Sequence, residues 1–211
     1  MSLAVAPARY IALIPLPEQA CVQVDAWAEE AQGASIPAFG WHITLLPPFV
    51  AGVHEAALVG AMDAALADVA AFPVALAAAN IVPDKTRPGY AAVFLECADA
   101  AADGCDAVGR LRDSLAQALD PFIHESLPAL RAAPFRPHLT LALSVSEQEA
   151  QRLARFARSR KLFARFTCDR VRLLRPETTP DHAVASWWHD LRLSSGPASA
   201  AEQAAQGELL P

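Results

Sequence analysis

Two short stretches of the chain alternate polar and apolar positions in nearly the same way. HITLL at 42–46 and HLTLA at 138–142 each place a histidine two residues before a threonine, with aliphatic residues between and after them. Because successive side chains of a strand point to opposite faces, each histidine shares a face with its threonine, and the first two aliphatic residues share the other face. The pattern predicts two strands, each with one apolar face turned to a core and one face that carries chemistry.

The two stretches occupy equivalent places in a repeated order of predicted elements. The first half is predicted to contain a strand over 9–17, a helix over 18–33, the strand from His42, a helix over 54–71 and one or two strands over 72–82. The second half is predicted to contain a strand over 90–97, a helix over 103–120, the strand from His138, a helix over 146–161 and strands over 162–175 and 183–193. Ser146 and Glu149 have the spacing of a capping box. The order predicts an internal duplication, with repeats of about 9–89 and 90–193, inside a single domain that spans 1–193.

The composition is typical of one globular domain followed by a short tail. Of the 211 residues, 54% are hydrophobic and 19% charged, which is enough apolar material for a substantial core. No apolar run approaches the roughly 20 residues that cross a bilayer, and Arg9 interrupts the N-terminal apolar residues, so we expect a cytoplasmic protein without membrane contact. Residues 194–211 are of low complexity and are expected to form a disordered or loosely attached tail.

The net charge limits the kinds of binding partner, and the cysteines and the acidic residues near His182 bear on disulfides and metal binding. The formal net charge of −6 argues against a protein that coats long nucleic acid, because that mode needs an excess of Lys and Arg, but it leaves room for a small nucleotide or an RNA end. The cysteines form no Cys-x-x-Cys pair and are expected to be reduced thiols: Cys21, Cys97, Cys105 and Cys168. Asp181, His182 and Asp190 lack a recognised ligand spacing, so no metal site is predicted.

The doubled motif resembles the 2H phosphoesterases, a family named for two His-x-Thr motifs, one in each half of an internally duplicated fold. RYIALIPLPE at 9–18 is similar to the opening of the bacterial 2′-5′ RNA ligase branch, and FRPHLTL at 135–141 is similar to its second motif. The resemblance covers nearly the whole chain up to about Leu193. It implies an α+β fold of two pseudo-symmetric lobes, with antiparallel sheets flanked by helices, around a central cleft that receives one His-x-Thr strand from each side.

Two facing His-x-Thr pairs suit the opening of a 2′,3′-cyclic phosphate. One imidazole can take a proton from water while the other protonates the departing ribose oxygen, because an ordinary imidazole pKa of about 6.5 allows either form near neutrality. His42 and His138 are the predicted acid and base, and Thr44 and Thr140 are predicted to donate hydrogen bonds to nonbridging phosphate oxygens. This hypothesis is a phosphodiesterase without metal or cofactor that acts on cyclic phosphates or 2′,5′-linked RNA, and its reversal would join RNA ends.

Four further residues are candidates for substrate contacts. Arg136 would share the face of His138 if the strand extends that far, and Trp41 would either stack on a base at the cleft rim or pack in the core. Tyr10 and Tyr90 occupy corresponding places in the two halves and are the other candidates. Leu143 stands where many members of the ligase branch carry an arginine, which puts one phosphate contact of that branch in doubt.

A second class of function stays open at this point. A noncatalytic module would use the same cleft to hold a phosphate or nucleotide ligand, because a fold does not fix its chemistry. In either case we expect a small nucleotide or RNA-end ligand, and a monomer is favoured. Turnover of nucleoside 2′,3′-cyclic phosphates in the presence of a chelator would distinguish the enzyme from the module.

Overall fold

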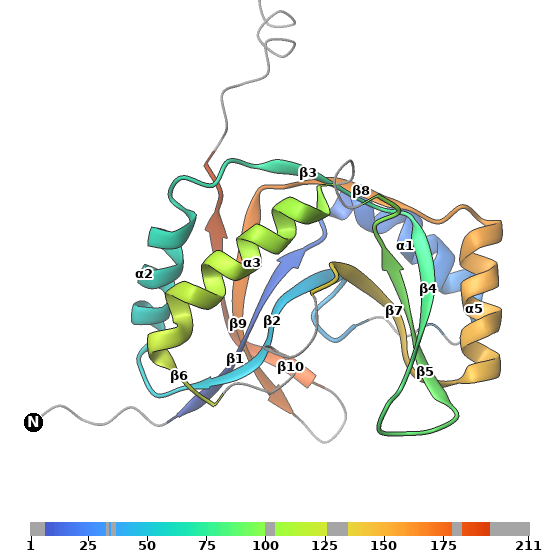
Figure 1. Ribbon diagram of the computed structural model, residues 1–211, viewed down its shortest axis with the longest axis horizontal. Helices are drawn as coiled ribbons and strands as arrows, with labels where there is room; N and C mark the ends of the chain where they lie inside the picture. The colour runs from blue at the N-terminus through green and yellow to red at the C-terminus, as the bar shows by residue number, and fades with distance from the viewer. Residues whose placement is uncertain are drawn as a thin grey trace, which may run out of the picture.

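The computed structural model describes residues 7–32, 34, 37–99, 104–125, 135–178 and 183–194. Figure 1 shows the elements in chain order: β1 (Ala8–Pro15), α1 (Glu18–Ala31), β2 (His42–Ala51), α2 (Glu55–Leu66), β3 (Phe72–Leu76), β4 (Ala78–Pro83), β5 (Tyr90–Glu96), α3 (Cys105–Leu119), the 3-10 turn η1 (Asp120–Phe122), β6 (Ile123–Glu125), β7 (His138–Ser146), α5 (Glu147–Ser159), β8 (Ala164–Cys168), β9 (Arg170–Thr178) and β10 (Ala183–Arg192). Each predicted strand and helix is present, and the stretch over 72–82 forms the two strands β3 and β4. The turn η1 and the short strand β6, between α3 and β7, were not predicted.

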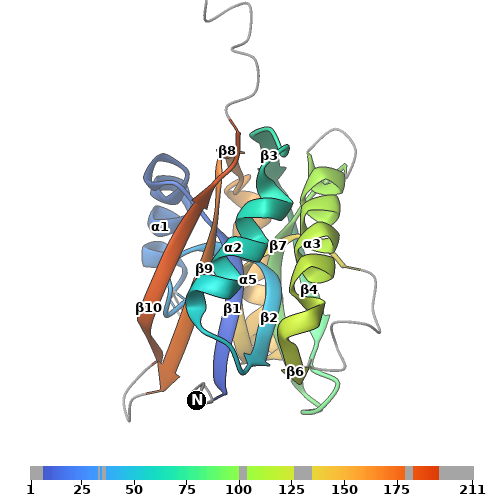
Figure 2. The ribbon, with the colours of Figure 1, turned by 90° about the vertical axis from the view of Figure 1, so that its left-hand side faces the viewer.

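The strands form one large antiparallel sheet and one small one. The large sheet has the order β10-β9-β1-β2-β7-β5-β4, with β6 pairing to β2, and the small sheet pairs β3 with β8. Figure 2 shows β10, β9, β1 and β2 following one another across the molecule. The expected antiparallel α+β class is confirmed. The strands of the two halves interleave, because β9 pairs with β1 and β4 pairs with β5, so the sheet is continuous rather than divided into one sheet for each half.

Among the described residues, four α-helices cover the sheet in two pairs. Helices α2 and α3 pack on each other and against β10 and β2, whereas α5 packs against β4, β5 and β7 and contacts α1 (Figure 1). In α5 the buried residues recur at helical spacing: Ala150, Leu153, Ala154 and Ala157. The predicted cap of this helix is confirmed, because the backbone N–H of Glu149 donates to Ser146 Oγ at 3.2 Å.

The start of α3 is fixed tightly against β3. Gly104 precedes the helix with φ of +74°, a left-handed conformation that favours glycine, and a Cβ at this position would collide with the carbonyl oxygen of Pro73. The next residue, Cys105, forms a disulfide with Cys97, which follows β5 directly. The prediction of four reduced thiols is therefore wrong for this pair, because the fold brings their Cα atoms to 6.5 Å, within the range that a disulfide spans.

Ser194, the last of the described residues, is tied to the fold by backbone hydrogen bonds. Ser194 is still held by the fold, since its N–H donates to the Val69 carbonyl at 2.9 Å and its carbonyl accepts from Ala71 N at 3.0 Å. The remainder of the predicted tail, 195–211, lies outside the described residues. In the described ranges, no helix is both long and apolar enough to span a bilayer.

Candidate active site

The two His-x-Thr strands have the same pattern of burial. β2 and β7 each begin with a half-buried histidine, a buried aliphatic residue and a half-buried threonine, followed by two buried residues. The apolar face of both strands is at most 1% exposed at Ile43, Leu45, Leu139 and Leu141. The predicted division into one core face and one face that carries polar side chains is confirmed.

The strands meet at the start of their motifs. β2 and β7 pair antiparallel with Ile43 opposite Leu139. Continuing that register by one residue on each side puts His42 opposite Thr140 and Thr44 opposite His138. All four polar side chains then share the face opposite to the buried Ile43 and Leu139 pair, in an arrangement with local twofold symmetry.

Both imidazoles are held by the backbone in the same way. His42 Nδ1 lies 2.7 Å from the Gly40 carbonyl oxygen, and His138 Nδ1 lies 2.8 Å from the Arg136 carbonyl oxygen. Because a carbonyl oxygen only accepts hydrogen bonds, these contacts require a proton on each Nδ1. In a neutral ring held this way, Nε2 carries no proton and is the nitrogen that can accept one.

The two imidazoles differ in their electrostatic surroundings. Burial lowers the pKa of His42, the hydrogen bond to Gly40 opposes that effect, and the charge of His138 lowers the pKa further. Burial also lowers the pKa of His138, but here the hydrogen bond to Arg136 and the negative charge of Glu96 both oppose it. Glu96 thus favours the protonated form of His138, whereas His42 has only its backbone contact to offset burial.

Glu96 is a residue that the sequence interpretation missed. It lies opposite His138 in the pairing of β5 with β7, so the two side chains share a face. Its side chain is buried, at 8% exposure, and its Oε2 accepts a hydrogen bond of 2.6 Å from Asn80 Nδ2. Phe94, two residues earlier in β5, stacks on the His138 ring with centroids 3.9 Å apart. A carboxylate and an aromatic ring therefore enclose His138 on one side.

A pair of oppositely charged residues, Arg172 and Asp190, lies on the same face of the sheet, on the side of β2 that is away from β7. Thr44 is opposite Leu13, Leu13 is opposite Arg172, and Arg172 is opposite Asp190, so these side chains form one row across β2, β1, β9 and β10. The Arg172 guanidinium donates to both carboxylate oxygens of Asp190, at 2.5 and 2.8 Å. Two strand spacings put Arg172 about 10 Å from Thr44 along this row. Sequence reasoning did not single out this arginine, because its row depends on strand register.

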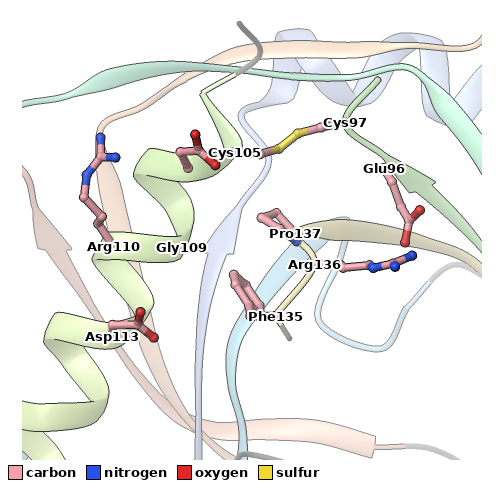
Figure 3. A pocket seen from close by; sticks show the side chains of 10 residues that line it. Glu96, Cys97, Cys105, Gly109, Arg110, Asp113, Phe135, Arg136 and Pro137 are labelled. Atoms are coloured by element: carbon pink, nitrogen blue, oxygen red, sulfur yellow. A yellow bond between two sulfur atoms is a disulfide. The ribbon is translucent and has the colours of Figure 1, made fainter. Parts of the chain in front are cut away.

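A pocket of about 550 Å³ opens beside His138. Figure 3 shows it between α3, the end of β5 and the segment 135–137, with Glu96 and Arg136 pointing toward each other. Arg136, a predicted contact residue, has an exposed side chain that lines this pocket, immediately before the motif. The cavity is thus adjacent to the second motif, and its other walls come from a helix that the motif pattern did not implicate.

The structure places two of the predicted contact residues in the core. Trp41 is 4% exposed, and its Nε1 donates to Asp25 Oδ1 at 2.7 Å, so its ring packs inside rather than at a cleft rim. Tyr10 is 1% exposed and packs on Phe49 with ring centroids 5.9 Å apart. Both residues pack in the core and do not present a surface to a substrate.

Tyr90 and Leu143 lie away from the motif histidines. Tyr90 starts β5 opposite Ser146, six residues from Glu96, a strand length of about 20 Å, and its ring lies under the Arg87 guanidinium at 4.1 Å. Leu143 is 58% exposed on β7. Among the described residues, no group of three His, Cys, Asp or Glu side chains has an arrangement that could hold a metal ion; Asp181 and His182 lie outside those residues.

The fold and the paired motifs define the class of this protein: an antiparallel α+β domain with two His-x-Thr strands joined side by side. The sequence profile of the 2′-5′ RNA ligase superfamily matches residues 16–180, and the chain belongs to that family, the 2H phosphoesterases. A comparison with curated proteins gives no match.

Solved structures share the fold at low sequence identity. E. coli LigT in its apo form is 17% identical, with a TM-score of 0.57 over 90% of this chain and 99% of that chain. TT0787 of Thermus thermophilus is 18% identical, with a TM-score of 0.59 over 90% of this chain and 100% of that chain. E. coli LigT complexed with 3′-AMP is 15% identical, with a TM-score of 0.59 over the same shares.

Proposed function

We propose that this protein is a phosphodiesterase that opens 2′,3′-cyclic phosphates and acts on 2′,5′-linked nucleotides, with His42 and His138 as the proton-transfer pair. The observation that carries the proposal is the pairing of Ile43 with Leu139, which turns both motif histidines and both motif threonines to one face. Membership in the 2′-5′ RNA ligase superfamily supports the reaction class, and LigT has been crystallised with 3′-AMP, ATP and NADP+.

The unequal surroundings of the two rings support the following assignment of roles. Nε2 of neutral His42 takes a proton from water, and the water oxygen attacks phosphorus. The bond from phosphorus to a ribose oxygen on the opposite side breaks, and His138 in its protonated form delivers its Nε2 proton to that oxygen. Burial lowers the pKa of His138, and the hydrogen bond to Arg136 and the charge of Glu96 oppose that effect. Thr44 and Thr140 donate hydrogen bonds to the nonbridging oxygens as negative charge grows there. With a ribose hydroxyl in place of water, the same steps form a 2′,5′ linkage.

The test is hydrolysis of adenosine 2′,3′-cyclic phosphate in the presence of EDTA. His42→Ala and His138→Ala should each lower kcat/KM by about 10²-fold to 10⁴-fold, as loss of a proton-transfer group does in other enzymes. His54→Ala is the matched control, because His54 is exposed at the start of α2 and its side chain makes no capping bond. Activity that EDTA abolishes, or that survives in both motif variants, would contradict the proposal.

The alternative function is a noncatalytic module that holds a nucleotide in the same place. Tight binding of 3′-AMP or 2′-AMP by the wild-type protein, with no turnover of any cyclic phosphate, would favour it. The matched hold on both rings, each with Nδ1 against a carbonyl oxygen and Nε2 left to exchange a proton, favours the enzyme, because a module that only binds phosphate does not need two such groups.

A further inference from the structure

The pocket beside His138 has features that the four motif residues do not explain. Its volume of about 550 Å³ falls within the range of about 300 to 1,000 Å³ typical of small-molecule sites. Its walls come from three separate parts of the chain: the end of β5, the first turns of α3 and the segment that leads into β7 (Figure 3). The Cys97–Cys105 disulfide joins two of those walls and restricts how far they can move apart.

The pocket adjoins the acid side of the proposed reaction. Glu96 lines the pocket and also lies opposite His138 in the strand pairing. Arg136 and Pro137 line it as well, and they precede His138 directly in the chain. The motif residues themselves do not line the cavity, but it borders His138 through its strand partner Glu96 and its chain neighbour Pro137.

In-line attack decides which part of a substrate lies there. The nucleophile and the leaving oxygen occupy opposite sides of phosphorus, so in the proposed reaction water lies on the side of His42 and the ribose oxygen lies on the side of His138. The ribose and its nucleobase are attached to that oxygen. We propose, on the basis of the function proposed above, that the pocket between α3, the end of β5 and residues 135–137 is the binding site for the nucleoside of the substrate.

The lining of the pocket suits a nucleoside. Asp106, Arg110 and Arg136 line the pocket, and between them they carry hydrogen-bond acceptors and donors of the kinds that bind the edges of a nucleobase and ribose hydroxyls. The ring of Phe135 adds an apolar surface. Such a mixture of apolar and polar groups is typical of sites that bind small organic ligands.

Gly109 leaves room for that ligand in the middle of α3. Glycine is unfavourable within a helix, and a Cβ built at Gly109 meets no atom within 4 Å, although the residue lines the pocket. A larger side chain at this position would therefore project into the cavity without colliding with the fold. Gly60 of α2 is the matched position, because it is also a helical glycine with no atom within 4 Å of a built Cβ, yet it does not line the pocket.

The experiment compares the binding of 2′-AMP with that of inorganic phosphate by titration calorimetry in Gly109→Leu, Gly60→Leu and the wild-type protein. We expect Gly109→Leu to lower the ratio of 2′-AMP affinity to phosphate affinity by about tenfold or more, since blocking a pocket costs the contacts of the group it held. Gly60→Leu should leave the ratio unchanged. Equal affinities for both ligands in the wild-type protein, or an unchanged ratio in Gly109→Leu, would overturn the proposal.

The readout separates this inference from the proposed function. Binding does not require turnover, so a selective loss of 2′-AMP affinity in Gly109→Leu would support the nucleoside pocket even if no cyclic phosphate were hydrolysed. Conversely, hydrolysis that depends on His42 and His138, together with an unchanged affinity ratio in Gly109→Leu, would support the enzyme and reject this pocket as the nucleoside site.

Discussion

Leu139→Ala and Thr140→Ala should separate stability from catalysis at adjacent residues of β7. Leu139 is completely buried and packs at the junction of β2 with β7, so truncation should lower the free energy of unfolding by about 3 kcal/mol, within the usual range for a buried leucine. Thr140 is half-buried on the opposite face, so its truncation should cost less than about 1 kcal/mol. Loss of a hydrogen-bond donor to the reacting phosphate should instead lower kcat by about hundredfold.

Urea unfolding followed by the fluorescence of the four tryptophans measures the first effect, and initial rates with adenosine 2′,3′-cyclic phosphate at 25 °C measure the second. Because a domain of ordinary stability retains several kcal/mol after a loss of about 3 kcal/mol, Leu139→Ala should remain folded and keep most of its activity per folded molecule. Leu143→Ala, at a position of the same strand that is 58% exposed, is the control and should change neither quantity.

The outcome that would refute this reasoning is a reversal of the two effects. If Thr140→Ala destabilised the protein as much as Leu139→Ala and left the rate unchanged, the threonine would be a structural residue and the assignment of the two strand faces would be wrong. If both variants lost stability and activity together, the junction could not be treated as a rigid support beneath a separate reactive face.

Three further predictions test the surroundings of the motifs. Glu96→Gln removes a negative charge and should lower the pKa of His138, so the alkaline limb of the pH profile of kcat/KM should move to lower pH. The titration of His138 followed by NMR should move in the same direction, and an unchanged limb would exclude Glu96 as a positioning residue. Trp41→Phe should lower the free energy of unfolding by about 1 kcal/mol in urea titrations, through the lost hydrogen bond, and leave KM unchanged. The hydrogen bonds from Arg172 lower the pKa of Asp190, so the pair stabilises the fold above the unfolded carboxyl pKa of about 3.9 and loses that effect as pH falls through the folded pKa. The difference in free energy of unfolding between the wild-type protein and Asp190→Asn, measured in urea at several pH values, should therefore shrink in acid.

The sequence was sufficient for features that depend on local spacing. The alternation around His42 and His138 predicted which residues are buried, and the spacing of Ser146 and Glu149 predicted a helix cap that the structure contains. These predictions hold because strand alternation and helix capping involve residues that are close in the chain.

Features that depend on strand order and register could not be predicted in the same way. The contact of β2 with β7 joins residues nearly a hundred positions apart, and it alone makes Ile43 and Leu139 partners. The burial of Trp41 depends on Asp25 of α1, and the disulfide depends on the approach of α3 to the end of β5. Composition and periodicity carry no information about which distant strands become neighbours.

Strand order also explains how two equal motifs can acquire unequal roles. β2 and β7 lie next to each other, and each has a different strand on its other side: β1 beside β2 and β5 beside β7. On the outer side of β7, β5 places Glu96 opposite His138, whereas on the outer side of β2, β1 places Pro15 opposite His42. A carboxylate favours an imidazolium and a proline does not, so two rings with the same hydrogen bond to a carbonyl differ in how far their surroundings oppose the effect of burial on the pKa. In the proposed reaction the doubled motif supplies the two imidazoles, and the strands that flank them supply the difference on which the assignment of His138 as the acid rests.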